Sequence, residues 1–132
     1  MHSVFVSFEM NAPAAKVWGI VGDPGQIALW HPAMAESSMT DRDRRVVLGN
    51  GAVIMERIER HDDAGMSYDY TMTDAPLPLE GYKSTLAVKP SAQGCVVEWS
   101  STFETEAVDD MVGLVRSVYV DGLNAVREAL AK

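Results

Sequence analysis

Glu56 is the residue of this chain whose position most favours acid–base chemistry. It lies in a stretch, residues 52–61, in which side chains alternate between two faces. One face carries Ala52, Ile54, Glu56 and Ile58, and the other carries Val53, Met55, Arg57 and Glu59. If the aliphatic face points into the protein, the carboxylate is buried with it, which is costly unless the charge is paired or neutralised and is typical of functional sites. The alternative is that a bulge reverses the register and Glu56 is a solvated partner of Arg57 or Arg45.

His31 is the second candidate for proton transfer. It lies between Trp30 and Pro32, where the proline forces the end of a short helix. An imidazole there would act as a general acid or base near neutral pH, or donate a hydrogen bond to a ligand carbonyl. The alternative is a packed corner that holds the helix on the rest of the protein. The spacing of His, Cys, Asp and Glu predicts no metal site.

Aromatic side chains recur on the apolar faces of two predicted strands. Tyr68 and Tyr70 share a face with two methionines, and Trp99 shares its face with Phe103. Tyrosine adds a polar group to an apolar wall, which suits a ligand that carries rings together with hydroxyls or carbonyls. The alternative is an ordinary core. The predicted ligand-binding residues are Trp30, Tyr68, Tyr70, Tyr82, Trp99, Phe103, Met111 and Tyr119.

The composition limits the class of protein. A chain of 132 residues is expected to form one domain, residues 1–132. Its single cysteine, Cys95, cannot form an internal disulfide, and no signal-peptide pattern is present, so we expect a cytoplasmic protein. No apolar stretch approaches the ~20 residues of a membrane span. The formal charge of −8 argues against binding to nucleic acid, and the only basic cluster is the short group Arg42, Arg44 and Arg45.

The periodicities predict one strand, two short helices, six strands and one long helix. We expect the first helix, residues 14–21, to be capped by Asn11 with Pro13 in its first turn. The second helix is predicted at residues 26–30. The predicted strands are residues 3–10, 34–40, 44–48, 52–61, 66–73, 82–89 and 95–104. Short turns between consecutive strands predict an antiparallel, curved sheet with one apolar concave face.

The long helix, residues 108–132, is the element expected to cover that face. Its apolar residues recur at steps of three and four, which places them on one side of the helix. The predicted buried stripe is Val108, Val112, Val115, Tyr119, Gly122, Val126 and Leu130. A glycine on the stripe costs about 1 kcal/mol relative to alanine, so Gly122 predicts a close approach of the helix to the sheet or to a ligand.

This order of elements, with its motifs, resembles the START/SRPBCC superfamily of helix-grip proteins, and within it the polyketide cyclase/dehydrase-like branch. The matching motifs are Asn11-Ala12-Pro13, Lys16-Val17-Trp18, Asp23-Pro24, Trp30-His31-Pro32, Glu56-Arg57-Ile58, Pro76-Leu77-Pro78 and Val97-Glu98-Trp99. The resemblance covers nearly the whole chain. It implies an α+β fold in which a seven-stranded antiparallel sheet wraps around the C-terminal helix, with a deep, mostly apolar cavity between them.

The resemblance also implies a function. We expect a hydrophobic ligand, aromatic or polyketide-like, in the cavity. If the protein is catalytic, we expect cyclisation or dehydration by acid–base chemistry, with Glu56, His31 or a tyrosine moving the proton. The alternatives are a non-catalytic lipid or metabolite carrier or sensor, and a protein-interaction module of the same fold. We expect no cofactor, and a monomer or a homodimer.

Overall fold

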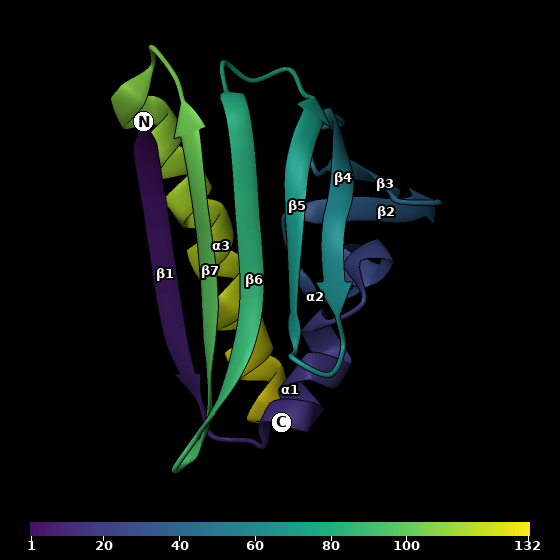
Figure 1. Cartoon of the computed structure of the whole chain (residues 1–132), viewed down its shortest axis with the longest axis vertical. Coiled ribbons are helices and arrows are strands. Elements are labelled where there is room, and N and C mark those ends of the chain that lie inside the picture. Colours follow the sequence, from purple (N-terminus) through teal and green to yellow (C-terminus); the bar gives the residue numbers. More distant parts are fainter.

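A computed structural model describes all residues, 1–132. Its elements occur in the predicted order (Figure 1). They are β1 (His2–Met10), α1 (Ala14–Val21), a 3-10 turn η1 (Pro24–Gln26), α2 (Ile27–Trp30), β2 (Met34–Thr40), β3 (Asp43–Leu48), β4 (Val53–Asp62), β5 (Ser67–Asp74), β6 (Glu80–Ser91), β7 (Gly94–Glu104) and α3 (Val108–Leu130). The strand boundaries differ from the predicted ones by no more than two residues at any end.

The seven strands form one antiparallel sheet in the order β1-β7-β6-β5-β4-β3-β2. Strands β2 to β7 therefore form a meander, and β1 extends it as an edge strand by pairing with β7. The sheet is strongly curved, so that β2 and β3 run across the direction of β6 in Figure 1. This curvature gives the sheet an inner, concave face and an outer face.

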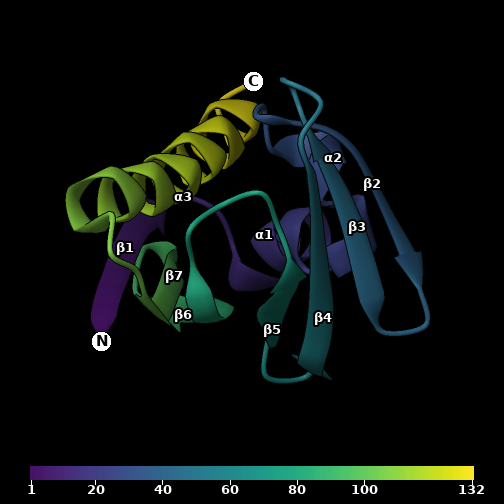
Figure 2. The same ribbon diagram turned by 90° about the horizontal axis from the view of Figure 1, so that it is seen from above.

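The helices lie on the inner face. Viewed from above, α3 lies over β1, β7 and β6, whereas α1 and α2 lie within the curve of the sheet, α1 against β6 and β7 and α2 against β2 (Figure 2). The long helix carries Asp109 and Asp110 in its first turn, where the helix dipole favours negative charge. Its buried residues are Met111, Val115, Tyr119, Gly122, Leu123 and Val126. The predicted stripe is therefore correct at its centre, while Val108 is 37% exposed at the helix start.

The start of α1 differs from the prediction. Pro13 occupies the N-cap position, and no side chain caps the helix, so Asn11 does not have the predicted capping role. The pyrrolidine ring of Pro13 sets a φ of −59°, which leads the chain directly into the helix. The second helix is also divided, because Pro24–Gln26 forms a 3-10 turn before α2, and Asp23 accepts a hydrogen bond from the Gly25 N–H there.

Gly122 makes the predicted close approach. A Cβ atom at this position would lie 2.6 Å from His31 Cδ2 and 3.0 Å from the Trp99 ring. Any larger residue would push the helix away from the sheet, because neither neighbour is the flexible end of a side chain. Gly113, on the other side of α3, has nothing within 4 Å.

The two edge strands of the sheet, β1 and β2, differ in whether side chains bond to their backbone. Two arginines of α3 reach β1, where Arg127 donates to the Glu9 carbonyl at 2.9 Å and Arg116 donates to the Phe5 carbonyl at 3.4 Å. The Arg127 guanidinium also lies 4.4 Å from the centre of the Phe8 ring. No such side chains cover the backbone of β2. None of the three helices has the length and hydropathy needed to cross a membrane.

Candidate ligand site on the inner face of the sheet

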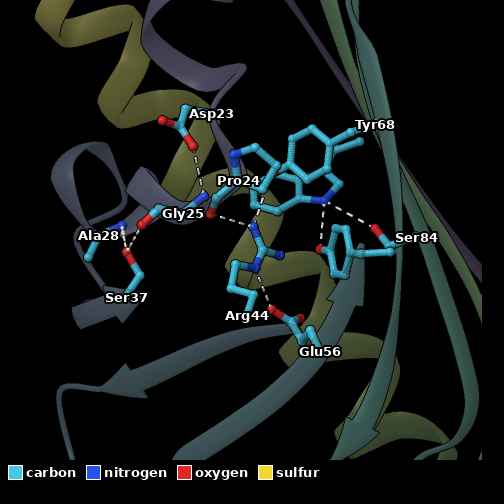
Figure 3. Close-up of polar contacts among 11 residues, drawn as sticks. Asp23, Pro24, Gly25, Ala28, Ser37, Arg44, Glu56, Tyr68 and Ser84 are labelled. Carbon is cyan, nitrogen blue, oxygen red and sulfur yellow. Dashed lines mark hydrogen bonds and ion pairs between the residues drawn. The ribbon is translucent and has the colours of Figure 1, made fainter. Parts of the chain in front are cut away.

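A buried ion pair between Arg44 and Glu56 is the main polar feature of the inner face. The two residues lie directly opposite each other on β3 and β4. Arg44 Nε donates to Glu56 Oε1 at 2.9 Å, and the two side chains are 1% and 9% exposed. One terminal nitrogen of Arg44 also donates to the Pro24 carbonyl at 3.0 Å and to the Tyr68 hydroxyl at 3.2 Å (Figure 3). Arg44 therefore joins the corner before α2 to the sheet.

Glu56 points inward, as the alternation of its strand predicts. The pairing of β4 with β5 shifts register on either side of it, after Met55 and after Ile58. Ile54, Glu56 and Ile58 nevertheless remain on one buried face. The bulge therefore does not turn Glu56 to solvent, and its partner is neither Arg57 nor Arg45 but Arg44.

Each member of the pair retains an atom that makes no hydrogen bond. These atoms are the second terminal nitrogen of Arg44 and the second carboxylate oxygen of Glu56 (Figure 3). Burial raises the pKa of Glu56, and the charge of Arg44 opposes this without cancelling it. Burial is the largest single influence on Arg44 and lowers its pKa, but the charge of Glu56 together with Tyr68 and Tyr70 outweighs burial, so the pKa is raised overall. The site thus combines a permanent cation with a carboxyl group that accepts a proton more readily than an exposed one.

A network of hydrogen bonds joins the inner face of the sheet to α3. Ser84 Oγ donates to the Ser100 carbonyl at 2.9 Å, so it accepts from the Tyr119 hydroxyl at 3.0 Å and from Trp99 Nε1 at 3.2 Å. Tyr119 in turn accepts from the Tyr82 hydroxyl. These bonds fix the direction of each hydroxyl and connect β6, β7 and α3. Burial raises the pKa of Tyr68, Tyr70, Tyr82 and Tyr119, so all four phenols stay protonated at neutral pH.

The predicted aromatic residues pack together in this interior. Tyr68, Tyr70, Tyr82 and Phe103 follow one another across the sheet, with neighbouring ring centres 5.9, 6.1 and 6.0 Å apart. Trp99 stacks on Tyr119 at 4.4 Å. Each of these six residues is less than 7% exposed. The interior is therefore filled by side chains in this structure, and a ligand would have to displace some of them.

Met111 and Trp30 lie at the margins of this group. Met111 is 8% exposed and belongs to the buried stripe of α3, one helix turn before Val115. Trp30 lies 5.7 Å from Trp99, ring centre to ring centre, and is only partly buried, but its Nε1 is buried and has no hydrogen-bond partner. This N–H is a donor available to a ligand oxygen.

His31 is held by backbone groups on both sides of its ring. Its Nε2 donates to the Val118 carbonyl of α3 at 2.7 Å, and its Nδ1 accepts from the Ala33 N–H at 3.1 Å. This arrangement requires the neutral ring, and burial lowers the pKa of His31 accordingly. The geometry favours the packed-corner alternative, because neither nitrogen is free to exchange a proton with a ligand.

Half-buried apolar side chains occur on the strands that flank Glu56 and in the loop before β6. Met72 is the residue opposite Glu56 on β5, and Leu48 follows Arg44 and Val46 on the inner face of β3. Leu77 and Leu79, from the loop before β6, are also partly exposed and packed on the core. These residues offer an apolar surface beside the polar pair. No three His, Cys, Asp or Glu side chains of the structure are grouped as metal ligands.

Arg44 and Ser84 are the polar site residues that are absent from the predicted set, and Leu48, Met72, Leu77 and Leu79 are the apolar ones. From the sequence, Arg44 is noted only as part of a short basic cluster. The signal was present, since Arg44 alternates with Val46 and Leu48 on a strand in which Arg45 and Val47 point the other way. Ser84 carried no comparable signal, because its role depends on the register between β6 and β7.

The sheet curved around a long C-terminal helix, with a polar pair on its apolar inner face, is the helix-grip fold predicted above. The chain belongs to the family described as polyketide cyclase/dehydrase and lipid transport, whose model matches residues 1–131.

Solved structures with the same architecture include XoxI of Bacillus cereus, with a TM-score of 0.96, 31% identity, and coverage of 100% of this chain and 97% of the other. An uncharacterized protein of Bacillus thuringiensis has a TM-score of 0.94 at 31% identity, covering 99% and 100% of the two chains. A START superfamily protein of Mycobacterium smegmatis has a TM-score of 0.77 at 14% identity, covering 98% and 99%, and shows the fold alone. No curated protein is significantly similar to the chain in sequence.

Proposed function

We propose that this protein binds an apolar small molecule that carries a hydroxyl group, on the inner face of the sheet beside Glu56. The observation that carries the proposal is the Arg44–Glu56 pair. Desolvating two charges costs several kcal/mol per ion in a protein interior, so a buried pair is weak evidence for stability and needs another explanation. Binding supplies one, because one carboxylate oxygen remains unbonded next to an apolar surface.

The roles of the residues follow from their contacts. Glu56 accepts the hydrogen bond of the ligand hydroxyl, and Arg44 holds the carboxylate in place. Trp30 Nε1 donates to a second ligand oxygen. Met72, Leu48 and the loop leucines contact the ligand's apolar body. Hydrogen bonds to an ionised carboxylate are roughly twice as strong as neutral ones, so the hydroxyl gives the site its selectivity.

The family also includes enzymes, and Glu56 is the residue that would move a proton if the ligand is turned over. Cyclisation or dehydration at this site stays a prediction. The carrier or sensor function needs no further group, because every residue named above acts by binding.

A direct test uses two probes that differ in one hydrogen-bond donor, 2-naphthol and 2-methoxynaphthalene. Tryptophan fluorescence of the full chain reports binding, since Trp30 borders the proposed site and its ring centre lies 5.7 Å from that of Trp99. We expect wild type to prefer 2-naphthol by about tenfold, and Glu56→Gln to lose most of that preference. Glu59→Gln, which changes an exposed glutamate on the other face of the same strand, is the matched control.

Equal binding of the two probes by wild type would contradict the role of Glu56. Extraction of the protein purified from its own host identifies the natural ligand. If native mass spectrometry shows a stoichiometric protein partner and no small molecule, the interaction-module alternative replaces this proposal.

A further inference from the structure

The outer face of the sheet carries a hollow, whose lining also includes Tyr70 and Ser84 of the inner-face network. It has a volume of about 720 Å³ and extends over the strands from β1 to β4. Figure 1 looks onto this face, with α3 behind the strands. No helix or loop covers it. Its floor consists of small side chains, Ser3, Thr71, Thr85, Ser100 and Thr102.

The register of the strands arranges this hollow in two rows. In one row, Phe5, Ser100, Thr85 and Asp69 lie opposite one another on β1, β7, β6 and β5. In the next row, the same strands contribute Ser3, Thr102, Lys83 and Thr71. At ~4.8 Å between strands, each row is about 14 Å long, which is enough for two sugar rings.

An aromatic ring stands at one end of the first row and carboxylates at the other. Phe5 is 55% exposed on the edge strand, one of the few large apolar side chains on the surface. Asp69 is fixed by two hydrogen bonds from Arg60, at 2.9 and 3.1 Å, and by one from Thr85 at 2.8 Å. Glu59 accepts from Thr71 at 3.1 Å. The acceptors of the hollow are thus held in place.

Several donors in the hollow have no partner in the protein. The hydroxyls of Ser3, Ser100 and Thr102 make no side-chain hydrogen bond, and Lys83 makes no ion pair. The carboxylates of Asp69 and Glu59 and the cations of Lys83 and Arg60 lie around the hollow, so the charges there are nearly balanced. A ligand of high charge of either sign therefore gains little here, and the net charge of −8 opposes an anion.

We propose that this hollow binds a neutral saccharide. Sugar rings have one face of C–H groups, which packs on an exposed aromatic ring such as Phe5, and a rim of hydroxyls that both donate and accept. The carboxylates of Asp69 and Glu59 and the hydroxyls of the floor match that rim. The proposal does not depend on the function of the inner site.

Nuclear magnetic resonance titration of the full chain with maltose, cellobiose, lactose and chitobiose tests the proposal. For at least one of them we expect a dissociation constant of about 1 mM, with shifted amides in β1, β7 and β6 on the outer face. Phe5→Ala should weaken binding at least about tenfold while the spectrum shows a retained fold. Leu29→Ala removes another exposed apolar side chain, 80% exposed and outside the hollow, and should change nothing.

Three results would overturn the proposal. One is the absence of outer-face shifts with all four sugars. Another is equal binding of the sugar by Phe5→Ala and wild type. The third is the same set of shifts on dilution of the protein without sugar, which would mean that a second copy of the chain occupies this face.

Discussion

Two ion pairs of the same chemistry lie on opposite faces of the sheet. Arg44–Glu56 on the inner face and Arg60–Asp69 on the outer face each join a guanidinium to a carboxylate on a neighbouring strand, and both N–O distances are 2.9 Å. The side chains of the first pair are 1% and 9% exposed, and those of the second are 45% and 36% exposed. The pKa of Glu56 is raised and that of Asp69 is lowered. The comparison shows that surroundings, rather than distance, set the energetic role of such a pair.

Removing one charge from the inner pair is expected to have the largest effect. Arg44→Met leaves Glu56 buried without a partner, which should lower the free energy of unfolding by about 3–5 kcal/mol. Chemical denaturation followed by circular dichroism measures it. The double variant Arg44→Met with Glu56→Leu removes both charges and should recover most of the loss, because a buried pair contributes little net stability. A double variant as unstable as the single one would show that the pair itself stabilises the fold.

The two glycines of α3 extend the comparison of inner and outer faces to one helix. Gly122→Ala places a methyl group 2.6 Å from His31, so we expect a loss of about 1–3 kcal/mol from overpacking. Gly113→Ala meets no neighbour and should instead stabilise the protein by about 0.5–1 kcal/mol through helix propensity. Thermal unfolding of the two variants distinguishes the cases. Equal changes of the same sign would mean that the close contact at Gly122 does not constrain the helix.

The pH dependence of stability should have opposite signs for the two carboxyl groups. The folded pKa of Glu56 lies above its ordinary value of 4.5. Its contribution to the free energy of unfolding is therefore fully present below pH 4.5 and is lost as the pH rises through the folded pKa. The folded pKa of Asp69 lies below 3.8, so its contribution is present above pH 3.8 and is lost as the pH falls through the folded pKa. Each contribution is obtained as the difference in free energy of unfolding between wild type and Glu56→Gln or Asp69→Asn, measured across acidic pH. If both stability differences changed with pH in the same direction, this would contradict the conclusion that burial raises the pKa of Glu56 while the pKa of Asp69 is lowered.

The outer pair, Arg60–Asp69, should make the smallest contribution to the free energy of unfolding. Asp69→Asn at neutral pH is expected to cost under about 1 kcal/mol, because the pair is solvated and screened by salt. Urea denaturation at low and high salt checks this, since the small effect should shrink further at high ionic strength. A cost comparable to that of Arg44→Met would show that the exposed network of Arg60, Asp69 and Thr85 stabilises the sheet cooperatively.

The sequence predicted the fold closely because its signals are local. Alternation places Glu56 on the inner face, and the apolar period of α3 identifies Gly122 as a contact position. The partners could not be predicted in the same way. Arg44 reaches Glu56, Pro24 and Tyr68 only because β3 pairs with β4 in one register and the corner before α2 folds back on the sheet. The residue type of Asn11 predicts a cap for α1, but Pro13 occupies the N-cap position and begins the helix without it.

The arginines that cover β1 have a consequence for the association of this protein. An exposed edge strand is a template on which another chain can add a strand, and natural proteins block such edges with charged side chains. Arg127 and Arg116 occupy β1 carbonyls that an added strand would need. Growth of the sheet by another chain, whether in ordered assembly or in aggregation, is therefore directed to β2. In a stressed or partly unfolded population, loss of α3 would remove this block and expose the second edge as well.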